Sequence, residues 1–207
     1  MFESQRVGVF VDVQNMFHSA KNLVKGKINY ERFLEGVVAG RQLVRATAYI
    51  TQKQGINQSN FHDALIRFGY DLRVKELRVR ENSDGSKSVA RGSWDVGMSL
   101  DIMAMSNKLD VVVLCAGNGE FSHLIEALKA KGIRTEVVGF DRSTAVELRK
   151  LADEFVPIED SWWFQDNKND DQPPTNDQQP TNDQPEESEE NDNIGNRIET
   201  NKFGVLS

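Results

Sequence analysis

Apolar and polar positions follow a regular pattern along the first 158 residues, and this pattern predicts strands and helices in turn. Continuous apolar runs predict strands at residues 6–13, 43–50, 109–115, 133–140 and 155–158. Apolar positions three and four residues apart predict helices at residues 15–24, 30–38, 59–68, 94–105, 121–131 and 143–153. Residues 70–80 alternate apolar and charged side chains and predict a bulged strand, and Ser-Asp-Gly-Ser at residues 83–86 predicts a hairpin turn.

Strands that are apolar on both faces and alternate with helices are typical of a parallel sheet covered on both sides. The predicted fold class is therefore α/β, a three-layer α/β/α arrangement with a mostly parallel central sheet. The crossovers between its parallel strands are expected to be right-handed. In such folds ligands bind beyond the carboxyl ends of the strands, so the candidate chemistry is sought there.

The pattern stops near residue 160. The sequence beyond it is rich in Asn, Asp, Gln and Pro, and PTNDQ occurs in it twice, at Pro174 and Pro180. Such a segment has little apolar surface to bury and is expected to be disordered. We therefore expect one folded domain over residues 1–160 and an acidic, low-complexity tail over residues 161–207. The apolar residues of its last stretch indicate either a motif for a protein partner or a frayed terminus.

Charge is divided unevenly between these two parts. The chain has 25 Lys and Arg against 32 Asp and Glu, a net charge of -7 and a pI of about 5.1. Residues 159–193 carry a net charge of -11, whereas residues 1–158 carry +3. The mildly basic folded part is compatible with a nucleic acid partner. The tail is either a solubilising linker or an electrostatic mimic of RNA that covers a basic groove.

Several other classes of protein are excluded by composition. Cys115 is the only cysteine, so neither an intramolecular disulfide nor a cysteine-based zinc cluster can form. The three histidines lack the spacing of a zinc site. No apolar run approaches the roughly 18 residues of a membrane span, and the N-terminus lacks the features of a signal peptide. We expect a soluble cytoplasmic protein without a membrane partner; the oligomeric state is left open.

Polar residues follow two of the most apolar strands. Asp12 and Asn15 come directly after the first strand, and Asn118 and Glu120 come after the strand at residues 109–115. The carboxyl ends of parallel strands share one edge of the sheet, so these side chains are expected to converge there. Asp and Asn are also the preferred residues at helix starts, and capping alone is the alternative explanation.

A third acidic position lies at the helix predicted from residue 94. Ser93 is a plausible N-cap, and Asp95 falls in the first helical turn, where the helix dipole favours an acid. Asp101 follows six residues later, which places it about 120° further around the helix. Asp95 is therefore the better candidate for the site, and Asp101 is expected to hold a neighbouring backbone or basic group.

Carboxylates that converge repel one another unless a cation lies between them. Mg²⁺ or Mn²⁺ is the expected cofactor because both bind oxygen ligands and retain water molecules. Such an ion activates a water molecule and neutralises charge on a phosphodiester. The predicted catalytic and metal-binding residues are Asp12, Asp95, Asn118 and Glu120.

The three segments FVDVQN, WDVGMSLDIM and LCAGNGEFSHLI resemble, in this order, the motifs of the NYN domain family (its LabA-like branch) within the PIN-like nuclease superfamily. Asp12 and Asn15 match its D-x-x-N motif, and Asp95 and Asp101 match its D-V-x-x-x-x-D motif. Arg91 stands for the basic residue that precedes the second motif. The resemblance covers most of residues 1–158 and implies a PIN-like, Rossmannoid fold and a metal-dependent ribonuclease. We expect this activity to be directed at phosphodiester bonds of single-stranded RNA.

The third motif departs from the family pattern. The family usually has Asp at the positions of Asn118 and Glu120, and Pro at the position of His123. Asn118 can offer a carbonyl oxygen to a cation but carries no charge, whereas Glu120 keeps the charge on a longer side chain. The alternative function is therefore a catalytically weak or inactive RNA-binding or regulatory protein of the same fold.

Basic residues between positions 67 and 91 outnumber acidic ones by seven to four. Such a stripe suits a groove that follows the backbone of single-stranded nucleic acid, and a solvated strand pair is the alternative. A phosphatase is disfavoured, because its D-x-D motif would require an acid where Gln14 stands. The predicted substrate-binding residues are Arg78, Arg80, Arg91, Ser93, Gly117 and Gly119.

Overall fold

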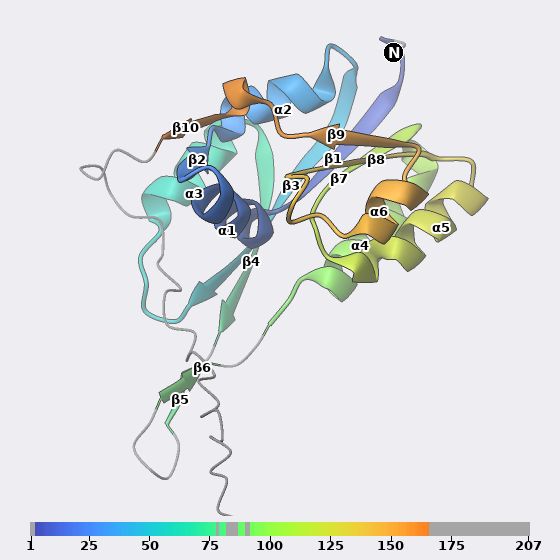
Figure 1. Ribbon diagram of the computed structural model, residues 1–207. Helices are drawn as coiled ribbons and strands as arrows, with labels where there is room; N and C mark the ends of the chain where they lie inside the picture. Colours follow the sequence, from blue (N-terminus) through green and yellow to red (C-terminus); the bar gives the residue numbers. More distant parts are fainter. Residues whose placement is uncertain (1–2, 78, 82–86, 90–91, 166–207) are drawn as a thin grey trace, which may run out of the picture. The chain divides into compact units, whose positions relative to one another are not determined.

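The centre of the fold is a six-stranded sheet in which every pair of neighbouring strands is parallel (Figure 1). The computed structural model describes residues 3–77, 79–81, 87–89 and 92–165. The strand order is β4-β3-β1-β7-β8-β9. Their bounds are β1 (Arg6–Asp12), β3 (Gln42–Lys53), β4 (Tyr70–Leu77), β7 (Val111–Cys115), β8 (Arg134–Gly139) and β9 (Glu154–Pro157).

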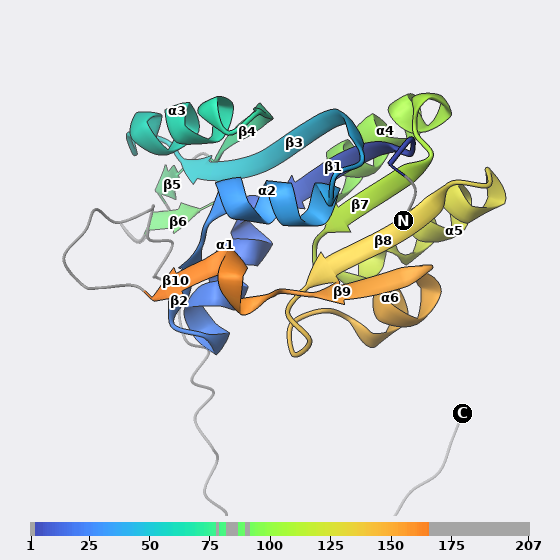
Figure 2. The ribbon, with the colours of Figure 1, turned by 90° about the horizontal axis from the view of Figure 1, so that it is seen from above.

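Three helices cover each face of this sheet (Figure 2). The first face carries α1 (Val13–Leu23), α2 (Tyr30–Val38) and α3 (Ser59–Arg67). The second carries α4 (Asp95–Met105), α5 (Ser122–Ala130) and α6 (Val146–Leu151), with the short 3-10 turns η1 (Ser106–Lys108) and η2 (Gly119–Phe121). The predicted three-layer α/β/α class is thus confirmed. No helix in the described part of the chain is both long and apolar enough to cross a membrane.

The alternation of side chains along β1 explains the two separate cores. Val7, Val9 and Val11 are fully buried against α1 and α2, whereas Phe10 is fully buried with the residues of α4 and α5. Successive side chains of a strand point to opposite faces, so an apolar run without interruption requires cover on both sides. β1 therefore lies in the middle of the sheet, between β3 and β7.

One small sheet was not predicted from the pattern. β2 (Gly26–Ile28) pairs antiparallel with β10 (Trp163–Gln165), and the turn η3 (Asp160–Trp162) precedes β10. Trp162 is buried against Phe33, and a Cβ on Gly36 would collide with its indole ring. Trp162 thus packs on the edge of the domain. The fold includes residues 161–165, five residues beyond the boundary expected at residue 160.

The segment expected as one bulged strand is two strands. β4 ends at Leu77, and β5 (Val79–Glu81) pairs antiparallel with β6 (Lys87–Val89), as a hairpin requires. The predicted turn at residues 83–86 lies outside the described residues. Another difference concerns α6, which begins three residues later than expected. Residues 140–145 form a turn instead, in which the backbone N–H groups of Ser143 and Thr144 donate to the carbonyl of Phe140.

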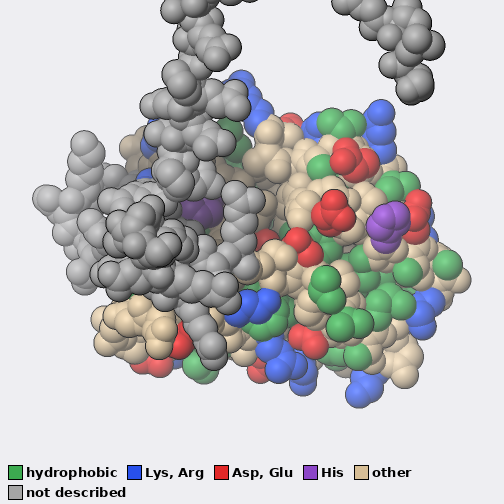
Figure 3. Space-filling model, turned by 90° about the horizontal axis from the view of Figure 1, so that it is seen from below, with side chains coloured by type: hydrophobic (Ala, Val, Ile, Leu, Met, Phe, Trp, Pro, Cys, Tyr) green, Lys and Arg blue, Asp and Glu red, His purple; other side chains and the backbone are tan. Residues whose placement is uncertain are grey.

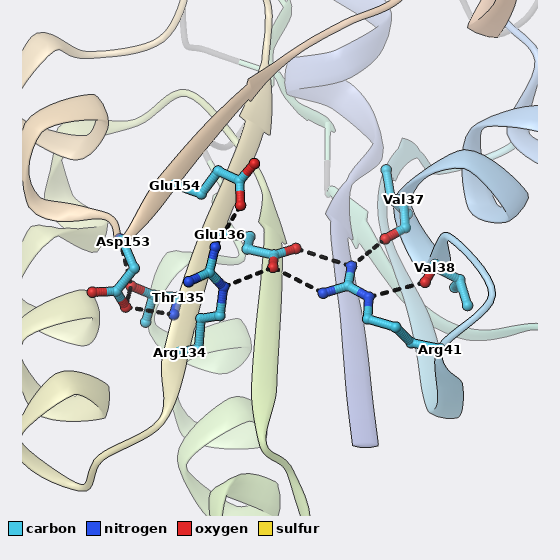
Figure 4. A network of polar contacts seen from close by, with 8 residues as sticks. All are labelled: Val37, Val38, Arg41, Arg134, Thr135, Glu136, Asp153 and Glu154. Atoms are coloured by element: carbon cyan, nitrogen blue, oxygen red, sulfur yellow. Dashed lines mark hydrogen bonds and ion pairs between the residues drawn. The ribbon is translucent and has the colours of Figure 1, made fainter. Parts of the chain in front are cut away.

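A buried ion pair joins the end of α2 to β8 (Figure 4). The guanidinium of Arg41 lies 2.8 Å from a carboxylate oxygen of Glu136, and both side chains are almost fully buried. Arg41 also donates to the carbonyls of Val37 and Val38, and Arg134 donates to Glu136 from the other side. Buried charges persist when they are paired and hydrogen-bonded, as this pair is.

Replacing Arg41 by Met is expected to lower the free energy of unfolding by about 3 kcal/mol, since it leaves the buried carboxylate of Glu136 with only Arg134 as a partner. Chemical denaturation measures this loss. Arg45→Met removes an exposed ion pair with Asp71 and serves as the control, with an expected loss of about 1 kcal/mol or less. Equal losses in the two variants would contradict the structural role of the buried pair.

Candidate active site

Asp12 lies where β1 ends and α1 begins. Its carboxylate accepts a hydrogen bond of 3.0 Å from the backbone N–H of Asn15, so it is the N-cap of α1. Burial raises the pKa of Asp12, and the negative charge of Asp95 raises it further, against the opposing effect of the backbone N–H of Asn15. The capping explanation for Asp12 is thus correct, and it does not exclude a role in the site, because Asp95 is close enough to act on its ionisation.

Asn118 links the end of β7 to the start of α4. Its side-chain amide donates a hydrogen bond of 2.9 Å to the carboxylate of Asp95. Its carbonyl oxygen accepts from the backbone N–H of Glu120 at 3.2 Å. Three segments that are distant in the sequence therefore meet at this point: the end of β1 with Asp12, the turn after β7 and the first residue of α4.

Gly117 brings two loops against the site. A Cβ at this position would collide with the carbonyl oxygen of Ser143 and would lie 3.2 Å from the side-chain amide of Asn15. The N–H of Ala145 donates to the carbonyl of Gly117 at 3.0 Å. Glycine is required here by this close approach, and the contact brings Asn15, which was expected at this edge of the sheet, next to the Asn118 turn.

Glu120 is not grouped with the two aspartates. Its side chain is exposed, and it contacts the site through its backbone N–H, which donates a hydrogen bond to the side chain of Asn118. Within residues 3–77 and 92–165, no three Asp, Glu, His or Cys side chains are arranged to hold a metal ion. The structure therefore brings together Asp12, Asp95 and Asn118, while Glu120 remains at the rim.

Asp101 turns away from this group, as the helical offset predicts. Its carboxylate accepts a hydrogen bond of 3.1 Å from the hydroxyl of Tyr49 and lies 3.3 Å from the guanidinium of Arg73. The expected basic partner of Asp101 is thus an arginine of β4. Burial raises the pKa of Tyr49, and the neighbouring charge of Asp101 adds to this effect, so the hydroxyl stays protonated as a donor.

Trp94 was not among the predicted site residues, yet it fixes the start of α4. Its indole N–H donates to the carbonyl of Ile50 on β3 at 2.9 Å, and its ring packs on Tyr49. The ammonium of Lys75 lies 4.4 Å from the ring centroid. The tryptophan immediately before Asp95 could have indicated this anchor from the sequence, because a half-buried indole requires a partner for its N–H.

Ser93 is not the N-cap of α4. Trp94 occupies the position before the helix, no side chain caps it, and the carbonyl of Ser93 instead accepts from the ammonium of Lys75 at 2.6 Å. Two other predicted substrate-binding residues, Arg78 and Arg91, lie outside the described residues, as does the side chain of Arg80.

Acidic and apolar side chains share the face that Figure 3 views from below. Apolar side chains gather on the half that carries α4, α5 and α6, with acidic side chains among them. The exposed apolar residues of these helices include Val96, Leu100 and Val146. Val96, the residue after the half-buried Asp95, is the most exposed of these apolar side chains.

The chain matches the model of the NYN domain over residues 6–159, and it belongs to this family. It is 31% identical over 163 residues to the low amplitude and bright protein LabA of Synechococcus elongatus, covering 77% of this chain and 87% of that protein. A crystal structure of a protein of unknown function from Vibrio parahaemolyticus is similar in fold, with a TM-score of 0.68 and 29% identity over 79% of this chain and 99% of the other. The family resemblance of the three motifs is thus confirmed.

Replacing Asp12 by Asn is expected to raise the melting temperature in the presence of a chelator at neutral pH. The variant removes a buried charge that Asp95 repels, and the amide oxygen can still cap α1. The folded-state pKa of Asp12 is raised, so the wild-type protein loses stability relative to the variant as the pH rises through that pKa. The gain should therefore shrink in acid, where the wild-type carboxyl is protonated.

Thermal melts over a range of pH measure this difference. Asp63→Asn, at an exposed position of α3, is the matched control and should not gain stability. A pH-independent gain, or one shared by the control, would show that charge at Asp12 is not its cause.

Proposed function

We propose that this protein is a divalent-metal-dependent ribonuclease that cleaves phosphodiester bonds of single-stranded RNA. The observation that carries the proposal is the grouping of Asp12, Asp95 and Asn118 at the ends of β1 and β7 and the start of α4. It occurs in a chain of the NYN family, which the resemblance places among the PIN-like nucleases. The similarity to LabA specifies no reaction, so the proposed activity rests on the site and the family.

The residues of the site fit Mg²⁺ or Mn²⁺. Asp12 and Asp95 would supply two carboxylates, and the side-chain carbonyl of Asn15 a neutral oxygen, the ligand types that these ions prefer. The side-chain carbonyl of Asn118 accepts from the N–H of Glu120 while its amide nitrogen faces Asp95, so Asn118 would turn its amide over to offer an oxygen to the ion. The pKa of Asp12 is raised by burial and by Asp95, and a cation between the two carboxylates would oppose both effects. Glu120 is proposed to contribute its exposed carboxylate from the next turn.

When bound, the ion would lower the pKa of a water molecule and offset charge on the phosphate. Asp12 and Asp95 would position it, because one caps α1 and the other opens α4, whose start Trp94 fixes to β3. Asp101 would contribute indirectly, because its ion pair positions the side chain of Arg73 on β4. Arg73 and Lys75 are proposed to help position the RNA backbone along this edge.

A second candidate function is RNA binding with weak or no cleavage. The hydrogen bond between Asn118 and Asp95 favours it, because an amide nitrogen engages a carboxylate oxygen where the family pattern has a second acid. One negative charge fewer weakens the attraction for a divalent ion. The two candidates share the site and the substrate and differ in catalytic rate.

Purified protein with end-labelled single-stranded RNA is expected to cleave it when Mg²⁺ or Mn²⁺ is present and to stop when a chelator is added. Asp12→Asn should reduce the rate by at least about 100-fold, since it removes a proposed ligand. Asp63→Asn, with the same change of charge, should keep full activity. Cleavage that persists in Asp12→Asn would point to a contaminant, and RNA binding without any cleavage would select the second candidate.

Asn118→Asp restores the acid of the family pattern and is expected to raise the cleavage rate at low metal concentration. It replaces a hydrogen bond to Asp95 by a third carboxylate, so affinity for the ion should increase and the metal-free protein should become less stable. Rates over a range of Mn²⁺ concentration and melts in chelator measure the two effects. An unchanged metal dependence would contradict a direct role of position 118 in the site.

A further inference from the structure

An open depression lies beside the Asn118 turn. Its lining consists of residues 117–119, of residues 141–146 in the loop between β8 and α6, and of Arg149. Asn118 belongs both to this lining and to the proposed active site, where it donates to Asp95. The depression is therefore continuous with the site.

One hydrogen bond joins its two walls, and two more lie within the loop that forms the second wall. The N–H of Ala145 donates to the carbonyl of Gly117 at 3.0 Å, and the N–H groups of Ser143 and Thr144 both donate to the carbonyl of Phe140 at 3.0 Å. Gly117 leaves no room for a Cβ beneath Ser143. The depression is thus a preformed feature of the fold, and a ligand there would meet walls that are already ordered.

The residues that line the depression carry a net charge of +1. Arg149 pairs with Asp141 at 3.0 Å and lies over the ring of Phe155, so these two opposite charges compensate each other. Arg142 is exposed and forms no ion pair with a described residue. Glu147 reaches Gly119 from the rim without belonging to the lining. An anion entering the depression would therefore meet one guanidinium with no competing partner.

We propose that this depression binds a backbone phosphate of the RNA next to the bond that is cleaved, with Arg142 as its main contact and the hydroxyl of Ser143 as a second. The proposal rests on the proposed function and extends it. A guanidinium binds two phosphate oxygens at once. The hydroxyl of Ser143, which donates to the carbonyl of Phe140 at 3.5 Å, would turn from this long hydrogen bond to donate to a third oxygen. A strand that passes over Asp95 and Asn118 reaches this depression without leaving the surface, since Asn118 borders both.

The test is binding of a short fluorescein-labelled single-stranded RNA to the full chain in chelator, where binding is measured without cleavage. Arg142→Ala should weaken binding about three- to tenfold and reduce the slope of log affinity against log salt by about 0.7, the effect of one phosphate contact on a single strand. Glu147→Gln should tighten binding about twofold, because it removes a negative charge from the rim.

Lys131→Ala is the control, since it removes one positive charge from an exposed residue at the end of α5, away from the depression. An Arg142→Ala effect no larger than that of Lys131→Ala would overturn the proposal. RNA carrying a 5′-hydroxyl or a 5′-phosphate distinguishes the source of the phosphate. An effect of Arg142 that needs the 5′-phosphate would assign the depression to a chain end and would also overturn it.

The same experiment separates this proposal from the function on which it rests. If the wild-type protein cleaves RNA while Arg142→Ala binds and cleaves like Lys131→Ala, the subsite fails and the ribonuclease stands. If the wild-type protein neither binds nor cleaves single-stranded RNA, the proposed function fails and the subsite fails with it. Inorganic phosphate that competes with RNA for the wild-type protein, but not for Arg142→Ala, would support the subsite directly.

Discussion

The parallel pairing of β1 with β3 on one side and β7 on the other is the constraint on which the site depends. Both faces of β1 are buried, so its register is determined by two cores at once. The pairing of Val11 with Cys115 ends β1 and β7 at nearly the same level. Asp12 and the turn of Asn118 follow directly, and neither residue could change its position without moving a buried strand.

Two residues fix the position of Asp95 relative to this part of the sheet. Trp94 attaches the start of α4 to β3 through Ile50, and Asn118 attaches it to the end of β7 through Asp95. Asp95 thus belongs to a helix held at two points. On the opposite side of the sheet, the buried pair of Arg41 and Glu136 holds the end of α2 to β8. The site thus lies at the edge of a sheet whose helices are attached by specific contacts on both faces.

The electrostatic character of the site follows from the asparagine. A third aspartate at position 118 would add repulsion to a pair in which the pKa of Asp12 is already raised. The amide of Asn118 instead donates to Asp95, which stabilises the carboxylate without a cation. The chain therefore gains a more stable metal-free state and loses attraction for a divalent ion, and this exchange separates the two candidate functions.

Much of the fold was predictable because β1 and β7 are continuous apolar runs and because Gly69 and Gly132 follow the ends of α3 and α5. The carboxyl-edge rule also predicted that Asp12 and Asn118 lie at one edge of the sheet, and the helical offset from Asp95 predicted the orientation of Asp101. β2 and β10 were missed because strands of three residues have no detectable period. The position of Glu120 and the anchoring by Trp94 depend on tertiary contacts between β3, α4 and the turn after β7, which spacing along one segment does not encode.

The central claim is that Asp12 and Asp95 form one divalent-metal site with Asn118. Titration of the protein with Mn²⁺, followed by electron paramagnetic resonance of the free ion, tests it most directly because it needs no RNA. The account predicts one site in the wild-type protein that is lost in Asp12→Asn and in Asp95→Asn and is kept in Asp63→Asn. Wild-type binding that is no tighter than that of Asp12→Asn would contradict it.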